Sequence, residues 1–222
     1  MTYLSRRSFL SGSACFASVV VSGCASDKAQ IKPVPYSEDP AYISMYGAMP
    51  TERFPLPAIN LKKVPERFYR QQVDYNTPEK VGTLVVDTQN FYLYLVQENK
   101  KAMRYGVGLG RAGFEWSGRA RIARKTEWPK WTPPEEMIER EPELEKWSWR
   151  NGGMPPGLEN PLGARALYIF QGNRDTLYRL HGTSEYWTIG TAVSSGCVRL
   201  MNQDIIDLFG RVPVGSPIVV LS

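Results

Sequence analysis

Two side chains able to carry out covalent chemistry lie in short, distinctive segments of the C-terminal half of the chain. His181, the single histidine, lies in RLHGT (179–183), and Cys197 lies in SSGCVRL (194–200). A cysteine reacts as its thiolate, and an adjacent imidazole both accepts the thiol proton and stabilises the negative charge. Gly196 has no Cβ to obstruct a substrate carbonyl, and backbone amides around Cys197 could stabilise an oxyanion by about 3 kcal/mol per donor. The two segments predict a cysteine nucleophile with a histidine base.

Each of these residues also has a structural interpretation. A histidine at a strand end is often a hydrogen-bonded structural residue, a single cysteine is often a small buried apolar side chain, and Arg199 could be a surface charge. Their occurrence together favours the catalytic interpretation. One histidine and three cysteines leave little for a zinc site, which needs about four ligands, so no metal and no other cofactor is expected. A thiol oxidoreductase is disfavoured, because no second cysteine is spaced as in a C-x-x-C pair.

Short β-branched and aromatic runs predict the strands that must position these residues. The runs 83–86 and 91–96 flank a turn composition at 87–90 and predict a hairpin. Further strands are predicted at 104–109, 166–170, 177–181 and 218–221.

One helix is predicted after the cysteine segment. Asn202 is expected to cap it. Its apolar face follows helical spacing and consists of Ile205, Leu208, Phe209 and Val212. Short strands with one helix indicate a mainly β sandwich or barrel.

The first residues indicate export. Arg6 and Arg7 precede a weakly apolar stretch at 9–21, and no acidic residue occurs before Asp27. This pattern is typical of a secretory leader, and the arginine pair resembles a twin-arginine signal. We expect residues 1–23 to be an export signal and the mature protein to lie in the periplasm or cell envelope.

The end of this leader resembles a lipobox. It reads VSGC at 21–24, and Cys24 would become the lipidated first residue of the mature chain. A multiply acylated terminus would hold the protein on a membrane surface. Ala25 at the next position favours the outer membrane by the same resemblance.

The composition excludes several classes of protein. Hydrophobic residues make up 42% and charged residues 22% of the 222 residues, as in a folded soluble protein. After residue 24, no apolar run approaches the roughly 18 residues of a membrane-spanning helix. Removal of the leader leaves 25 basic and 22 acidic residues, a net charge of +3, which disfavours a nucleic-acid partner.

The mature chain divides into three parts by composition. Residues 24–77 are rich in proline and predict a tether and an arm that packs partly on the domain. Residues 78–222 are expected to form the catalytic domain. Within it, a tryptophan-rich insertion at about 111–156 is either a decoration packed on the sandwich or a lid over the site.

The two chemical segments resemble the signature of the L,D-transpeptidase catalytic domains of the YkuD type, which include the ErfK and YbiS proteins. The match consists of HGT at 181–183 and SSGCVRL at 194–200. NPLG at 160–163 and the hairpin at 85–96 are also similar to that family. The resemblance covers about 78–222 and implies an L,D-transpeptidase-type β sandwich.

The resemblance also implies an activity. Cys197 would attack the carbonyl of the third residue of a peptidoglycan tetrapeptide stem, D-alanine would leave, and an acceptor amine would resolve the thioester. The acceptor would be another stem, a wall-anchored protein or a D-amino acid. The resemblance therefore implies a part in peptidoglycan biosynthesis, in the organisation of the cell wall and in cell shape.

Further site residues are carried over by the same resemblance. The carbonyl of Gly182 would orient the ring of His181, and Arg199 would order the motif or contact a stem carboxylate. The amides of Gly196 and Cys197 would line the oxyanion site. Thr183 and Trp187 would line the cleft. Ser195 stands where many members have a second histidine, so His181 would be the only base.

Two alternatives remain open at this point. A hydrolase on the same scaffold, an L,D-carboxypeptidase or an amidase, would resolve the thioester with water and shares the acyl-enzyme step. A wall-binding lipoprotein with a vestigial site would carry out no chemistry, although the intact pairing of Cys197 with His181 argues against it.

Overall fold

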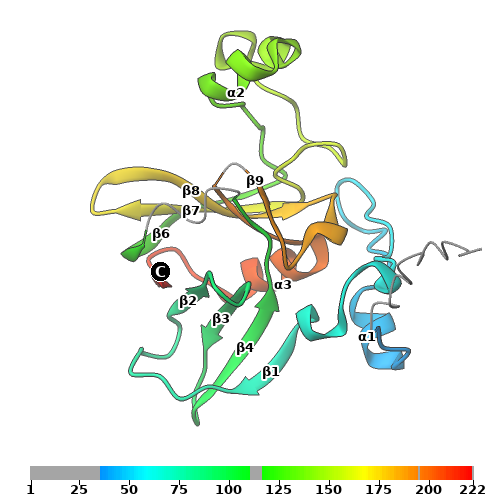
Figure 1. Ribbon diagram of the computed structural model, residues 1–222, viewed down its shortest axis with the longest axis vertical. Coiled ribbons are helices and arrows are strands. Elements are labelled where there is room, and N and C mark those ends of the chain that lie inside the picture. Colours follow the sequence, from blue (N-terminus) through cyan, green and yellow to red (C-terminus); the bar gives the residue numbers. More distant parts are fainter. Residues whose placement is uncertain (1–35, 111–116, 195, 222) are drawn as a thin grey trace, which may run out of the picture. The chain divides into compact units, whose positions relative to one another are not determined.

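A computed structural model describes residues 36–110, 117–194 and 196–221, and nine of its strands form one mixed sheet (Figure 1). The strands of this sheet are β1 Gln71–Asp74, β2 Leu84–Asp87, β3 Tyr92–Val96, β4 Lys101–Gly106, β6 Gly118–Glu127, β7 Arg165–Gln171, β8 Arg174–Thr183, β10 Val198–Met201 and β11 Pro217–Leu221. Their order across the sheet is β1-β4-β3-β2-β11-β6-β7-β8-β10. Two short strands, β5 Leu109–Gly110 and β9 Ala192–Ser194, pair separately.

Helices are few and short in the described part of the chain. The α-helices are α1 Pro40–Met45, α2 Glu135–Arg140 and α3 Asn202–Arg211. Single 3-10 turns occur at Leu61–Lys63, Glu66–Phe68, Pro142–Trp147, Trp149–Asn151 and Tyr186–Thr188. The prediction of a mainly β fold is confirmed.

One hydrophobic core joins the two halves of the sheet. It takes alternate side chains from β2–β4, such as Leu93, and from β6–β10, such as Leu180, together with Ile205 and Leu208 of α3. Figure 1 shows α3 between the two halves. Because both halves bury the same cluster, the continuous sheet bends around α3 and packs as a sandwich.

Local predictions of strands were largely correct. The hairpin is confirmed as β2 and β3, with Leu84 paired to Leu95. The strand predicted at 104–109 is wrong as a single element, because β4 ends at Gly106 and the chain turns to pair Gly108 with Arg199.

The helix prediction was correct in its apolar face and wrong in its cap. Met201 is the N-cap residue of α3, and Asn202 is the first helical residue. The amide oxygen of Asn202 accepts a hydrogen bond from the Ala164 backbone at 2.9 Å instead. A long-range contact thus replaces the local one.

The insertion predicted at about 111–156 is also wrong in its boundaries. Strand β6 lies inside that range, and it pairs with both β11 and β7 in the main sheet. The segment outside the sheet instead runs from Trp128 to Ala164, between β6 and β7. In Figure 1 its helix α2 lies on the other side of β7 and β8 from α3.

The proline-rich arm is partly built into the domain. Strand β1 extends the sheet at β4, so the arm assigned to 24–77 contributes a strand. Tyr46, Phe68 and Tyr69 are buried in a second cluster with Met201 of β10. The expected packing of part of the arm on the domain is confirmed.

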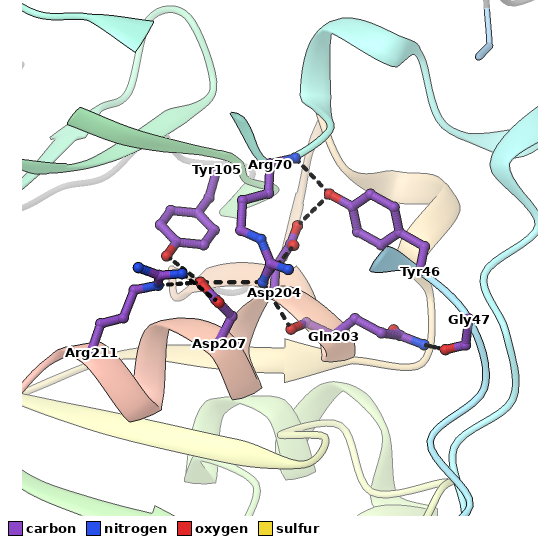
Figure 2. A network of polar contacts seen from close by, with 8 residues as sticks. All are labelled: Tyr46, Gly47, Arg70, Tyr105, Gln203, Asp204, Asp207 and Arg211. Atoms are coloured by element: carbon purple, nitrogen blue, oxygen red, sulfur yellow. Dashed lines mark hydrogen bonds and ion pairs between the residues drawn. The ribbon is translucent and has the colours of Figure 1, made fainter. Parts of the chain in front are cut away.

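A buried polar network fastens this arm to α3 (Figure 2). The Tyr46 hydroxyl donates to Asp204 Oδ2 at 3.2 Å and accepts from the Arg70 backbone at 2.6 Å. The Arg70 guanidinium lies 3.2 Å from Asp207 and 3.8 Å from Asp204, so Asp207 is its closer partner. Gln203 donates to the Gly47 carbonyl.

Asp204 should make the stability of the domain depend on pH. Burial raises its pKa from 3.8 to about 7, and the Arg70 charge only partly opposes this. The folded chain therefore binds a proton that the unfolded chain releases, so the free energy of unfolding falls as pH rises through this range, by at most about 1.4 kcal/mol per pH unit. Urea unfolding of Asp204→Asn should show a flatter dependence than the wild type between pH 5 and 8.

Asp207→Asn is the matched control for that measurement. Hydrogen bonds from Arg211 and Tyr105 hold the pKa of Asp207 below its usual value against the effect of burial. Asp207 therefore loses its stabilising charge only in acid. Between pH 5 and 8, the free energy of unfolding of Asp207→Asn should change with pH as steeply as that of the wild type. If the pH dependence of Asp204→Asn is as steep as that of the wild type, Asp204 is not the group that causes it.

Candidate active site

The parallel pairing of β8 with β10 brings the predicted base and nucleophile to one face of the sheet. Arg199 pairs with His181, and Val198 pairs with Leu180. Leu180 and Val198 belong to the core, so His181 and Arg199 face the opposite side. Cys197 precedes β10 beside Arg179, whose backbone hydrogen-bonds the thiol. Cys197, immediately before β10, and His181, on the neighbouring β8, therefore lie on the same face of the sheet.

The ring of His181 is fixed by backbone carbonyls. Its Nδ1 lies 2.6 Å from the carbonyl oxygen of Gly182, and the side chain is 5% exposed. A carbonyl only accepts, so Nδ1 carries the proton of the neutral ring and Nε2 keeps its lone pair. Gly182 thus sets the tautomer that a base requires.

Burial keeps this imidazole neutral. It lowers the pKa of His181 to about 4, and the charges of Arg199 and Arg179 act in the same direction. Hydrogen bonds to the carbonyls of Gly182 and Pro161 favour the protonated ring and only partly compensate. At neutral pH His181 is therefore an unprotonated base.

The thiol of Cys197 is neutral in the resting site as well. Burial raises its pKa, while the Arg179 backbone and the charges of Arg179 and Arg199 lower it. A neutral thiol beside a neutral imidazole differs from a preformed thiolate–imidazolium pair. If Cys197 attacks a substrate, its proton would therefore have to move from sulfur to a base as the new bond forms.

Alkylation of Cys197 by iodoacetamide should therefore accelerate continuously as pH rises from 6 to 9. A preformed ion pair would instead give a rate plateau that begins near the low pKa of its thiolate. Peptide mass spectrometry that follows the Cys197 peptide measures the rate at each pH. A plateau already present at pH 5 to 6 would contradict the neutral resting pair.

A β-bulge between β7 and β8 shapes the backbone and side chains beside Cys197. The pairing of β7 with β8 shifts register between Tyr168 and Phe170, and Leu177 has φ of 63°. Gly196 has φ of 120°, where only glycine is unstrained, and a Cβ there would lie 3.2 Å from the ring of Tyr178. The bulge thus sets Tyr178 against the backbone that precedes Cys197.

Arg199 is buried beside His181 with part of its guanidinium unused. The residue is 6% exposed, and Nη1 donates to Glu185 at 3.2 Å. Nε and Nη2 are buried without a hydrogen-bond partner in the described part of the chain. Burial lowers the pKa of Arg199, which reflects the cost of desolvating its charge. Two buried N–H donors of this kind suit an anion.

The segment that carries His181, Cys197 and Arg199 is similar to a known protein family. The family model of the L,D-transpeptidase catalytic domain, YkuD, matches residues 82–220, a range that contains His181, Cys197 and Arg199. The chain belongs to this family. The predicted resemblance over 78–222 is thereby confirmed.

Individual relatives of this L,D-transpeptidase domain agree with the family assignment. The Probable L,D-transpeptidase ErfK/SrfK of Escherichia coli is 34% identical over 147 residues, 62% of this chain and 43% of that protein. The Probable L,D-transpeptidase YbiS of Escherichia coli is 38% identical over 120 residues, 50% of this chain and 34% of that protein. The chain thus spans less than half the length of these curated relatives.

One solved structure is more similar in sequence. It is described as a probable carnitine operon oxidoreductase CaiA from Brucella melitensis and is 46% identical, with a TM-score of 0.50. The match covers 71% of this chain and 96% of that chain.

The remaining predicted residues of the L,D-transpeptidase site lie in different surroundings. Thr183 is buried, its hydroxyl accepts from the Glu185 backbone at 3.1 Å, and its carbonyl accepts from Asn202. Trp187 is 49% exposed, with the ammonium of Lys63 5.5 Å from its ring. Thr183 thus contacts the adjoining loop and α3, and Trp187 contacts the arm. Ser195 and Cys24 lie outside the described residues.

Sequence reasoning assigned no role to the buried amide that supports the base. Asn160 is 1% exposed and donates to the carbonyls of Pro129, Met154 and Pro155, while its oxygen accepts from Leu162. Asn160 joins the two ends of the 128–164 segment by these hydrogen bonds. It thereby places the Pro161 carbonyl beside His181. The available signal is NPLG at 160–163, which is similar to the family but does not by itself assign a role to Asn160.

The described residues contain no group of three or more histidine, cysteine, aspartate or glutamate side chains able to hold a metal ion. No helix among them is long and apolar enough to cross a membrane.

Proposed function

We propose that this domain is a peptidoglycan L,D-transpeptidase with Cys197 as nucleophile and His181 as base. The observation that carries the proposal is the pairing of β8 with β10, which brings both residues to one face, with the Gly182 carbonyl on Nδ1. Membership of the L,D-transpeptidase family supports the class of substrate.

Acylation begins as Cys197 Sγ attacks the carbonyl carbon of the third stem residue. The thiol proton passes to Nε2 of His181, and the carbonyl oxygen becomes an oxyanion near the amides of Gly196 and Cys197. Collapse of this intermediate breaks the peptide bond to D-alanine, whose amine takes the proton from the imidazolium. The products are a thioester on Cys197 and released D-alanine.

The acceptor amine then resolves the thioester. His181, neutral again, takes a proton from the amine as its nitrogen attacks the thioester carbonyl. The thiolate of Cys197 leaves and recovers that proton. The new amide joins two stems through their third residues when the acceptor is another stem, and no nucleotide is needed because the broken bond supplies the energy.

Arg199 would bind an anion in this scheme. Its unpartnered Nε and Nη2 support contact with a stem carboxylate, and its charge favours the thiolate of Cys197. Export, lipidation of Cys24 and a location in the periplasm or cell envelope complete the proposal, because the stems lie outside the cytoplasmic membrane.

Mass spectrometry of products tests the proposal with disaccharide-tetrapeptide as substrate. Loss of D-alanine together with a dimer joined through third residues is the expected result, with an adduct on Cys197 as intermediate. Loss of D-alanine that yields only tripeptide would replace the transferase with a hydrolase on the same thiol. No release and no adduct would overturn the proposal in favour of a binding protein.

A further inference from the structure

A row of side chains extends from Cys197 across the face of the sheet that carries the site. Cys197 lies beside Arg179 of β8, Arg179 pairs with Tyr168 of β7, and Tyr168 pairs with Arg124 of β6. Leu167, Leu180 and Val198, which adjoin Tyr168, Arg179 and Cys197, point into the core, and Arg124 is paired with Tyr168, so all four side chains lie on the opposite face. A substrate bound at Cys197 can therefore extend along this row.

Tyr168 is enclosed by two guanidinium groups. Arg124 Cζ lies 3.7 Å and Arg179 Cζ 4.5 Å from the centre of its ring, and the residue is 7% exposed. A guanidinium stacked on an aromatic face keeps its N–H groups in its own plane, available for hydrogen bonds at its edge. The ring thus holds Arg124 in a fixed orientation.

The two arginines differ in how their charge is compensated. Arg179 donates to both carboxylate oxygens of Asp175, at 2.7 and 2.9 Å. Arg124 is exposed and has no carboxylate within ion-pair distance in the described part of the chain. Of the two, Arg124 is the group whose charge is available to a ligand.

The position of Arg124 fits a particular part of the substrate. Its guanidinium lies over a residue of β7, two strands from β10, which corresponds to about 10 Å from the nucleophile at the usual strand spacing. Because an extended backbone spans at most about 3.6 Å per residue, this distance corresponds to about three residues, and carboxylates on the third stem residue and on the residue before it lie within it. Planar two-pronged contact with a carboxylate is the interaction for which arginine is best suited.

We propose that Arg124 is a specificity residue that binds a carboxylate of the donor stem, a proposal that rests on the proposed transpeptidase function. Two stem carboxylates have this chemistry. One is the α-carboxylate of the γ-linked glutamate that precedes the third residue, and the other is at the end of the third residue's diamino-acid side chain.

Donor stems with one carboxylate converted to a carboxamide test the proposal and distinguish the two sources. The wild type should release D-alanine from the unmodified donor with kcat/KM at least about tenfold higher than from the donor amidated at the recognised position. Arg124→Gln should lower kcat/KM for the unmodified donor and bring the ratio of the two donors close to one. Arg124→Lys should keep part of the preference for the unmodified donor, because lysine retains the positive charge but lacks the planar guanidinium that contacts both carboxylate oxygens.

Arg121→Gln is the matched control. Arg121 lies on β6 on the same face, paired with Phe170, and donates to the Gly172 carbonyl at 3.1 Å. The variant loses the same charge but should keep the wild-type ratio. If Arg121→Gln lowers the ratio of kcat/KM for the unmodified and amidated donors as much as Arg124→Gln does, the effect comes from general surface charge. That result would overturn the assignment of Arg124.

The remaining outcomes separate this inference from the function on which it rests. A purely structural role of Arg124 on Tyr168 would lower activity on both donors equally and keep the ratio, which overturns the inference. If the wild type releases D-alanine equally well from all donors, the role of Arg124 is overturned, but the proposed transpeptidase function is not. Absence of D-alanine release from every donor overturns the proposed function, and the inference with it.

Discussion

Replacement of His181 by glutamine is expected to abolish release of D-alanine from the tetrapeptide stem. Glutamine can still donate its amide N–H to the Gly182 carbonyl, but it has no nitrogen that takes up the Cys197 proton. Loss of a general base paired with a nucleophile costs about 10³-fold or more. Mass spectrometry of released D-alanine and of the Cys197 adduct measures both the rate and the step that is lost.

The double variant with Cys197→Ala provides the control. If the two residues act as one unit, removal of both should be no more damaging than removal of either. Additive losses would show that His181 acts apart from Cys197.

The same substitution should leave the melting temperature nearly unchanged at pH 7. The pKa of His181 is about 4 in the folded chain against 6.5 as its usual value, so the unfolded chain binds the proton first as pH falls. The wild type therefore loses stability between pH 6.5 and 4, and His181→Gln removes that loss. A large drop in melting temperature at pH 7 would instead support a structural role for His181.

The parts that could be predicted from the sequence are those with local signals. Alternating apolar residues and a turn composition defined the hairpin of β2 and β3, and helical spacing defined the buried face of α3. The glycine before Cys197 and the histidine segment pointed to the chemistry, because such residue types have specific uses near a nucleophile.

Strand β6 was missed because its pattern is irregular. A register shift lies between Ile122 and Arg124, so the alternation breaks in the middle of the strand. Its outward side chains are arginines, and Lys125 turns toward the C-terminal carbonyls of α3. Such a strand looks like a polar loop until its neighbours β11 and β7 are known.

Contacts between segments that are distant in the sequence could not be predicted either. The pairing of Gly108 with Arg199 and the contact of Asn202 with Ala164 depend on the packed sheet, and neither has a local signal. The burial of Arg199 follows from the same packing. An arginine in a strand would ordinarily be expected at the surface.

Arg199→Met is expected to separate activity from stability. The guanidinium is buried with Nε and Nη2 unpartnered, and Nη1 contacts Glu185, whose side chain is 57% exposed. An apolar side chain of similar length removes the desolvation cost, so stability should be unchanged or rise by about 1–2 kcal/mol. Activity should fall by about 10²-fold or more, because an anion loses its donors and the charge that lowers the pKa of Cys197 is gone.

Urea unfolding and kcat/KM for D-alanine release measure the two effects on the same preparation. Glu185→Gln is the matched control, since it removes the ion pair but keeps the guanidinium, and it should retain most of the activity. Parallel loss of stability and activity in Arg199→Met would show that the arginine only holds the motif together. Opposite changes would show that a charge costly to the fold is kept beside His181 for its effect on the substrate and the thiol.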